Sequence, residues 1–155
     1  MYHGRVPRLF RYMQALTRRP EVRVGTDLCS VAAVADAVDR FGARYLERVY
    51  TADELTYCLA APSVAAERLA ARFAAKEAAI KVLRPTGGAR PDWRSIEVRR
   101  HEEGWCELAL HAGAADLADD AGIESLAVSL SHEGDAAAAV VVALTTIPTH
   151  QQPQQ

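Results

Sequence analysis

Residues 72–83 read Arg-Phe-Ala-Ala-Lys-Glu-Ala-Ala-Ile-Lys-Val-Leu and form the second half of a predicted long helix. This helix begins after Pro62, where Ser63 can cap its first turn, and it ends near Leu83. Apolar residues recur along it at the spacing of one helical face, which predicts that this face packs against the rest of the domain. The apolar stripe consists of Leu69, Phe73, Ile80 and Leu83.

The same stretch contains the only two lysines of the chain, Lys76 and Lys81, on either side of Glu77, while every other basic residue is arginine or histidine. Glu77 and Lys81 follow each other along one helix edge, where such a pair stabilises by only a few tenths of a kcal/mol. Lys76 falls on the apolar stripe, where a charge is costly unless it meets a partner or a ligand. Arginine does not replace the compact charge of lysine, so both lysines are candidates for a functional site.

The residues before the long helix predict a strand and shorter helices. Val22 to Leu28 alternates between apolar and other residues, which is typical of a strand. A helical pattern follows from Ser30 to about Val49 and is interrupted at Gly42. Thr51 and Glu54 match a capping box, so another short helix is predicted to begin there.

The residues after the long helix predict mainly strands. The expected strands are 93–99, 105–110 and a hairpin over 126–144 that turns at 131–135, with a helix over 112–121 before the hairpin. The chain is therefore expected to have an α+β fold in which an antiparallel sheet packs against the long helix. We expect one domain over 22–146, an N-terminal extension over 1–21 and a disordered tail over 147–155.

The composition excludes several classes of protein. A net charge of −2 gives no broad attraction to nucleic acid or to a membrane surface. The longest apolar run, 136–144, is about half the length that spans a bilayer, and the N-terminus lacks the apolar core of a secretory signal. The three cysteines form no CxxC pair, so neither a disulfide framework nor a zinc site is expected. We expect a soluble protein of the cytoplasm, without a nucleic-acid or membrane partner.

Two further places carry polar residues that the fold does not require. Asp27 lies in an apolar strand beside Gly25, although Asp is disfavoured in strands, so it either serves a site or caps the following helix. Ser131 and His132 lie in the hairpin, where their side chains either bind an anion or form part of a solvated turn. Adjacent strand residues point to opposite faces, which argues against a hydrolase that uses these two as nucleophile and base.

These polar residues together predict a type of chemistry. The carboxylates of Asp27 and Glu77 are hard oxygen ligands, which suit Mg²⁺. The two lysines can neutralise phosphate charge, and the hairpin adds hydrogen-bond donors. The combination predicts phosphoryl-type transfer.

Five segments, in chain order, resemble the motifs of the holo-acyl-carrier-protein-synthase type of the 4'-phosphopantetheinyl transferase superfamily. They are 24–31 (Val-Gly-Thr-Asp-Leu-Cys-Ser-Val), 48–54 (Arg-Val-Tyr-Thr-Ala-Asp-Glu), 72–83, 93–98 (Trp-Arg-Ser-Ile-Glu-Val) and 128–133 (Val-Ser-Leu-Ser-His-Glu). The Lys-Glu-x-x-x-Lys pattern alone is weak, but the ordered set is specific. The resemblance extends from about residue 22 to residue 144.

The resemblance implies an activity and a set of roles. The chain would move 4'-phosphopantetheine from coenzyme A to a serine of an apo carrier protein, with Mg²⁺, and release 3',5'-ADP. The implied metal ligands are Asp27 and Glu77, the implied catalytic residues are these two and Lys81, and the implied cofactor-binding residues are Arg72, Lys76, Lys81, Ser131 and His132. Either Glu77 or a metal-bound water would deprotonate the serine. Single-domain members of the family are homotrimers with active sites between subunits, so a homotrimer is expected.

Departures from the family pattern concern the carrier. Ala32 and Ala33 stand where the family often has arginine, Ser30 stands in place of a glutamate, and Arg84-Pro85 replaces a glycine after the helix. The donor is therefore better defined than the acceptor, which is an acyl, polyketide or peptidyl carrier protein. The alternative is a degenerate relative that binds coenzyme A or a carrier protein without catalysis.

Overall fold

The computed structural model describes residues 18–88 and 90–148. The predicted N-terminal extension over 1–21 and the predicted tail over 147–155 fall mostly outside the described residues. Where they are described they belong to strands, because the first strand begins at Arg18 and the last ends at Pro148.

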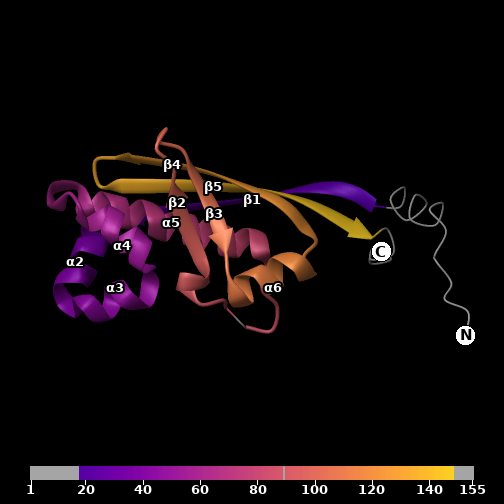
Figure 1. Cartoon of the computed structure of the whole chain (residues 1–155), viewed down its shortest axis with the longest axis horizontal. Helices are drawn as coiled ribbons and strands as arrows, with labels where there is room; N and C mark the ends of the chain where they lie inside the picture. The colour runs from indigo at the N-terminus through magenta and orange to yellow at the C-terminus, as the bar shows by residue number, and fades with distance from the viewer. Residues whose placement is uncertain (1–17, 89, 149–155) are drawn as a thin grey trace, which may run out of the picture.

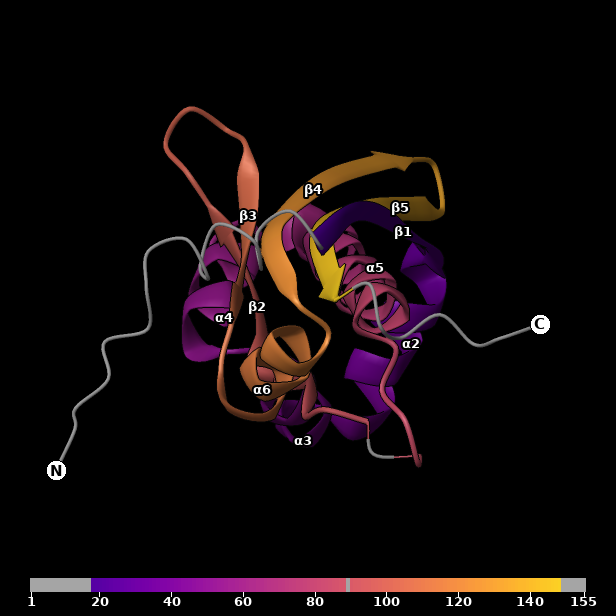
Figure 2. The same ribbon diagram turned by 90° about the vertical axis from the view of Figure 1, so that its right-hand side faces the viewer.

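The elements follow in the order β1 (Arg18–Ser30), α2 (Val31–Phe41), α3 (Ala43–Val49), α4 (Ala52–Leu59), η1 (Pro62–Val64), α5 (Ala65–Leu83), η2 (Trp93–Ser95), β2 (Ile96–Arg100), β3 (Cys106–Leu110), α6 (Ala112–Asp120), β4 (Ile123–Glu133) and β5 (Ala136–Pro148). One antiparallel sheet has the strand order β1-β5-β4, and β2 and β3 form a separate antiparallel pair. The long helix α5 runs along one face of the three-stranded sheet (Figure 1). Figure 2 shows α5 nearly end-on beneath this sheet, with the β2–β3 hairpin to one side. The predicted α+β fold is confirmed.

Local signals placed several boundaries correctly. Gly42 separates α2 from α3 with a positive φ of 54°. The Ser30 hydroxyl caps α2 by accepting a hydrogen bond from the backbone N–H of Ala33. Thr51 and Glu54 form the complete capping box of α4.

Several boundaries differ from the prediction. The first strand and the hairpin strands are longer than expected, and the strand predicted over 93–99 begins with the 3₁₀ turn η2. Ser63 lies in the 3₁₀ turn η1, and α5 follows this turn without a side-chain cap. The hairpin turn is shorter than 131–135, because β4 continues through Glu133, which pairs with Ala136. Cross-strand pairing satisfies the backbone groups of the extra residues, so only Gly134-Asp135 connects the strands.

Small side chains allow α5 to approach the sheet closely. Gly25 of β1 faces the helix, and a Cβ at this position would lie 2.1 Å from the carbonyl oxygen of Ala78 and 2.9 Å from Cγ2 of Val82. Only glycine therefore fits here without a shift of the helix or the strand. Asp27, two residues further along β1, points to the same side, so the same close contact brings its carboxylate against α5.

A buried ion pair ties α4, α5 and β2 together. The Lys76 ammonium lies 2.8 Å from Oε2 of Glu54, and both side chains are fully buried. Lys76 also donates hydrogen bonds to the carbonyl oxygens of Trp93 and Ile96. Glu54 accepts hydrogen bonds from the backbone N–H groups of Val98 (3.0 Å) and Thr51 (2.8 Å). Burial lowers the pKa of Lys76, and the Glu54 carboxylate opposes that shift.

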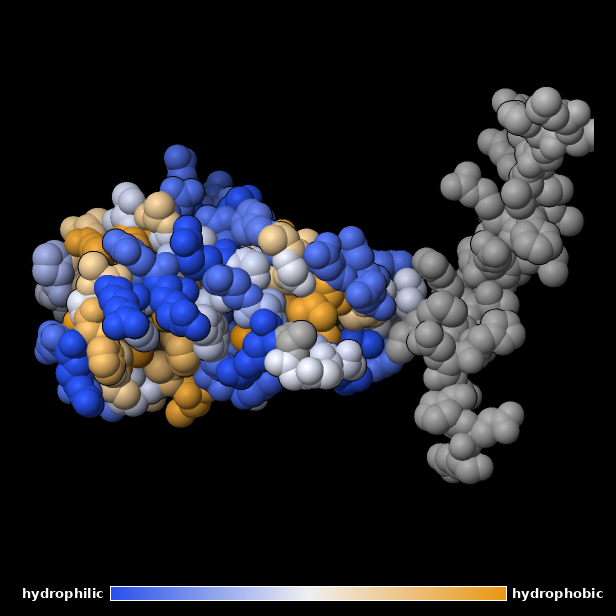
Figure 3. Space-filling model, turned by 90° about the horizontal axis from the view of Figure 1, so that it is seen from below, coloured by the Kyte–Doolittle hydropathy of each residue, from blue (hydrophilic) through white to orange (hydrophobic). Residues whose placement is uncertain are grey.

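The outer face of the three-stranded sheet is apolar along much of β1 and β5, whereas its β4 part exposes Ser125, Ser129 and Ser131. The exposed large hydrophobic residues of this face are Val22, Val24 and Leu28 of β1 and Val140, Val142 and Leu144 of β5. The helical side, seen from below in Figure 3, shows hydrophilic and hydrophobic residues interspersed. A contiguous exposed apolar surface marks an interaction site. None of the helices in the described part of the chain is both long and apolar enough to cross a bilayer.

Gly25→Ala is expected to lower the free energy of unfolding by about 1–3 kcal/mol, because the added methyl group meets backbone atoms of α5. Urea denaturation followed by circular dichroism measures the change. Gly113→Ala in α6 is the matched control, because nothing lies within 4 Å of a Cβ there. Equal stability of the two variants would contradict the proposed close packing at Gly25.

The two lysines should differ sharply in their effect on stability. Lys76→Met leaves the Glu54 carboxylate buried without its counter-ion and is expected to cost about 3–5 kcal/mol. Lys81→Met removes a partly exposed ion pair and is expected to cost about 1 kcal/mol or less. The same urea titration compares them, and a similar loss in both variants would show that Lys76 has no special structural role.

Candidate active site

Asp27 and Lys81 meet at the contact between β1 and α5. The Lys81 ammonium lies 2.8 Å from Oδ1 of Asp27 and donates a second hydrogen bond, of 2.5 Å, to the carbonyl oxygen of Thr26. The side chain of Asp27 is 19% exposed and that of Lys81 is 51% exposed. Asp27 does not cap the following helix, because Ser30 has that role. The carboxylate is therefore held at the surface beside a cation.

Glu77 lies one helical turn before Lys81, at the same edge of α5. Its side chain is 16% exposed, and Nη2 of Arg90 lies 3.1 Å from one carboxylate oxygen and 3.5 Å from the other. Arg90 comes from the loop after α5 and is 60% exposed. Both predicted metal ligands thus face a cation supplied by the chain itself.

The donor set fits a Mg²⁺ ion. Asp27 and Glu77 supply carboxylate oxygens that are neither fully exposed nor buried in the core. Within residues 18–88 and 90–148, no three His, Cys, Asp or Glu side chains gather in a cluster that could enclose a metal. Mg²⁺ needs no such cage, because it commonly takes one or two carboxylates and completes its shell with water and substrate phosphates.

Lys76 lies in the core, apart from this cluster. Its ammonium is fully buried and is satisfied by Glu54 and two carbonyl oxygens. This position does not fit the expectation that Lys76 contacts the coenzyme. The sequence pattern correctly placed Lys76 on the buried stripe, but nothing local to it indicated that Glu54 is its partner.

The hairpin residues lie apart from Glu77. His132 is exposed, and its Nδ1 lies 3.6 Å from Oε2 of Glu67 near the start of α5. Glu67 precedes Glu77 by ten residues, which corresponds to about 15 Å along the helix axis. Ser131 is exposed on β4 and pairs with Ala138. A single chain therefore does not bring the hairpin motif to the Glu77 carboxylate.

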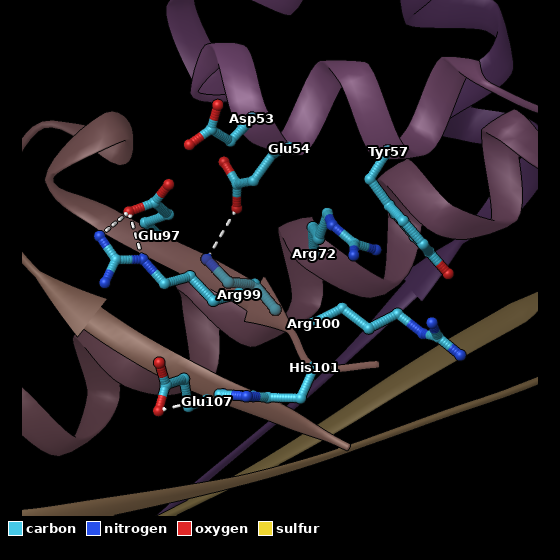
Figure 4. A pocket seen from close by; sticks show the side chains of 10 residues that line it. Asp53, Glu54, Tyr57, Arg72, Glu97, Arg99, Arg100, His101 and Glu107 are labelled. Atoms are coloured by element: carbon cyan, nitrogen blue, oxygen red, sulfur yellow. Dashed lines mark hydrogen bonds and ion pairs between the residues drawn. The ribbon is translucent and has the colours of Figure 1, made fainter. Parts of the chain in front are cut away.

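Arg72 lines a cavity of about 330 Å³ between α4, α5 and β2 (Figure 4). Its side chain is almost fully buried, and its Nη1 donates to the carbonyl oxygen of Arg68. Its Nε has no hydrogen-bond partner, and no carboxylate of the described residues forms an ion pair with it. The guanidinium lies 4.3 Å from the ring centre of Tyr57, and Arg68 and Arg100 approach the same ring.

Three of the four acidic residues that line this cavity pair with other residues, and the fourth, Asp53, is exposed and forms no ion pair with Arg72. Glu54 binds Lys76, and Glu97 binds Nε2 of His111 at 2.8 Å and Arg99 at 2.9 Å. Burial would raise the pKa of Glu97, but the hydrogen bonds from His111 and Arg99 outweigh it and lower the pKa. Arg72 is thus left as a buried cation without an anion, which favours binding of a phosphate or carboxylate from outside.

The sequence did not reveal Arg90 or Tyr57 as parts of these sites. Arg90 lies in a loop with no periodic pattern, and Tyr57 looks like an ordinary apolar position of a short helix. Their contacts join residues of different elements, or of a helix and a loop. The only hint of the cavity beside Tyr57 was the four-residue spacing of Arg72 and Lys76, which places two cations on one side of α5.

Comparison with known proteins gives a consistent result. A family model described as the 4'-phosphopantetheinyl transferase superfamily matches residues 23–141. A holo-[acyl-carrier-protein] synthase of Chloroflexus aurantiacus is 45% identical over 130 residues, which cover 77% of this chain and 95% of that protein. A holo-[acyl-carrier-protein] synthase of Halothermothrix orenii is 41% identical over 119 residues, which cover 77% of this chain and 94% of that protein.

The solved structures agree with the sequence comparison. The ACPS–CoA complex of Chronobacterium ammoniagenes superposes with a TM-score of 0.70 at 31% identity, and the match covers 81% of this chain and 98% of that one. The family match spans the strand that carries Asp27, the helix that carries Glu77 and Lys81, and the hairpin that carries Ser131 and His132. The chain therefore belongs to the 4'-phosphopantetheinyl transferase superfamily.

Proposed function

We propose that this protein is a holo-[acyl-carrier-protein] synthase, which transfers 4'-phosphopantetheine from coenzyme A to a serine of an apo carrier protein and releases 3',5'-ADP. The observation that carries the proposal is the contact of Asp27 with Lys81, one turn from Glu77, within a chain that matches the family along most of its length. The curated relatives are named for this activity, and one solved relative is a complex with CoA.

We assign Mg²⁺ to Asp27 and Glu77, where it would polarise the pyrophosphate of coenzyme A. Lys81 is already held beside Asp27, so its ammonium can stabilise the negative charge that develops as 3',5'-ADP leaves. Glu77 has two carboxylate oxygens, so it can bind the metal through one and accept the proton of the carrier serine through the other. These assignments make Asp27, Glu77 and Lys81 the catalytic set.

Arg72 is proposed to bind a phosphate of coenzyme A. A buried guanidinium that lacks a carboxylate partner matches the geometry of a phosphate group. Arg72 and Glu77 are five residues apart on α5, so their side chains leave the helix about 140° apart. One chain therefore presents Arg72 on a different side from the catalytic set.

A second copy of the chain would complete the site. We propose a homotrimer in which Asp27, Glu77 and Lys81 of one subunit meet the hairpin of a neighbour, with Ser131 and His132 beside the coenzyme. The exposed apolar surface on β1 and β5 supports this, because such a surface is expected to be covered. We place the reaction in the cytoplasm, where the free thiols of Cys29, Cys58 and Cys106 stay reduced.

Incubation with coenzyme A, Mg²⁺ and a panel of apo acyl, polyketide and peptidyl carriers tests the proposed activity. We expect a phosphopantetheine mass gain on at least one carrier, measured by mass spectrometry, and its loss when EDTA removes the metal. Asp27→Asn and Glu77→Gln should each lower the transfer rate by about a hundredfold or more while the circular dichroism spectrum is retained.

Asp116→Asn is the control for this assay, because Asp116 is an exposed acidic residue of α6. Its rate should equal that of the unmutated protein. Coenzyme A binding without a mass gain on any carrier would favour the degenerate relative that binds without catalysis. Near-normal transfer by Asp27→Asn would show that the metal assignment is wrong.

The oligomer is tested by size-exclusion chromatography with light scattering at micromolar concentration. We expect three times the chain mass of 16.8 kDa for the unmutated protein. Val142→Glu, which places a charge in the apolar sheet face, should shift the population towards monomer and lower activity with it. Leu59→Glu changes an exposed hydrophobic residue of α4 outside that face and should leave the mass unchanged. A monomeric unmutated protein would rule out the trimer.

A further inference from the structure

The ion pair between Arg90 and Glu77 lies where the proposed function requires a divalent cation. Nη2 of Arg90 is within 3.5 Å of both oxygens of the Glu77 carboxylate. A metal ion that binds this carboxylate must therefore compete with the guanidinium for the same oxygens. The metal ion and the Arg90 guanidinium are both positively charged, so they also repel each other when they are close.

Arg90 is held less firmly than Lys81. Lys81 extends from a helix and contacts both Asp27 and the carbonyl oxygen of Thr26. Arg90 extends from the loop between α5 and η2, and Glu77 is the only carboxylate of the described residues with which it pairs. Its side chain is also the more exposed of the two cations. Arg90 is therefore the cation that can leave when a metal binds.

A second position for the Arg90 guanidinium is available nearby. A cavity of about 280 Å³ is lined by Arg48, Ile80, Arg90, Pro91, Asp92 and Trp93. The Arg90 guanidinium lies 5.6 Å from the Trp93 ring centre, and both residues line this cavity. Oδ1 of Asp92 accepts a hydrogen bond from the backbone N–H of Arg94, so this carboxylate already caps η2. Two arginines at one cavity favour a phosphate group.

We infer that Arg90 is a further binding residue of the proposed reaction, which exchanges Glu77 for a phosphate oxygen of coenzyme A when a divalent cation binds Glu77. This inference rests on the proposed metal site. The exchange makes cation and coenzyme bind cooperatively. The cation occupies the Glu77 carboxylate and frees Arg90, and the coenzyme phosphate binds Arg90 and frees Glu77. By linkage, the cation strengthens coenzyme binding by the same factor as the coenzyme strengthens cation binding.

Mn²⁺ binding in the absence of coenzyme A tests the competition directly, with free Mn²⁺ measured by electron paramagnetic resonance. Arg90→Ala should bind Mn²⁺ about two- to fivefold more tightly than the unmutated protein, because an exposed ion pair no longer has to break. In saturating Mg²⁺ the same variant should bind coenzyme A about fivefold or more weakly by isothermal titration calorimetry, because one phosphate contact is lost. Arg94→Ala is the control, since Arg94 is a neighbouring exposed arginine, and both affinities should stay unchanged.

Unchanged or weaker Mn²⁺ binding by Arg90→Ala would overturn the inference. Glu77→Gln in the same titration then separates this failure from that of the proposed function. If Glu77→Gln weakens Mn²⁺ binding, the metal site stands and only the role of Arg90 is wrong. If Glu77→Gln also binds Mn²⁺ normally, the metal site itself is wrong and both proposals fall.

Discussion

A lysine ammonium without access to water must find its hydrogen bonds and its counter-charge inside the protein, and Lys76 does so. Glu54 supplies the charge, and the carbonyl oxygens of Trp93 and Ile96 accept the remaining hydrogen bonds. Because Glu54 also accepts hydrogen bonds from the backbone N–H groups of Thr51 and Val98, the Lys76–Glu54 pair joins α4, α5 and β2. A shift of any of these elements would leave a buried charge or a buried N–H unsatisfied, which makes this arrangement difficult to deform.

This constraint orients α5, and the orientation of α5 separates the roles of the two lysines. With Lys76 held towards α4 and β2, the small residues of the helix face the sheet, and Gly25 allows β1 to come into contact with Ala78. The edge that carries Glu77 and Lys81 is then presented at the surface beside Asp27. The lysine in the core thus supports the position of the lysine at the site. Their similar sequence surroundings conceal this difference in function.

The electrostatics of the site explain how it can remain stable before its ligands bind. Asp27 and Glu77 are close to the surface and each is neutralised by a cation of the chain, so neither carboxylate is left unpaired. In the cavity beside Tyr57 the balance is reversed, because Arg72 has no anionic partner among the described residues. We interpret the acidic pair Asp27 and Glu77 and the unpaired Arg72 as complementary parts of the binding site. One place offers carboxylates for a cation, and the other offers a guanidinium for a phosphate.

Most of the fold and the candidates for catalysis could be predicted from the sequence, because they depend on local patterns. The alternation of β1 placed Asp27 on the face of Gly25, the capping box defined the start of α4, and helical spacing placed Glu77 and Lys81 on one edge. The ordered motifs indicated the family, which the comparisons confirm. The partners of the charged side chains could not be predicted in this way. The contacts of Lys76 with Glu54, and of Arg90 with Glu77, join different elements or a helix and a loop, so only tertiary packing brings these groups within a few ångströms of each other. Tertiary structure also decided that His132 lies beside Glu67, about 15 Å along the α5 axis from Glu77, because this contact joins the hairpin to a helix.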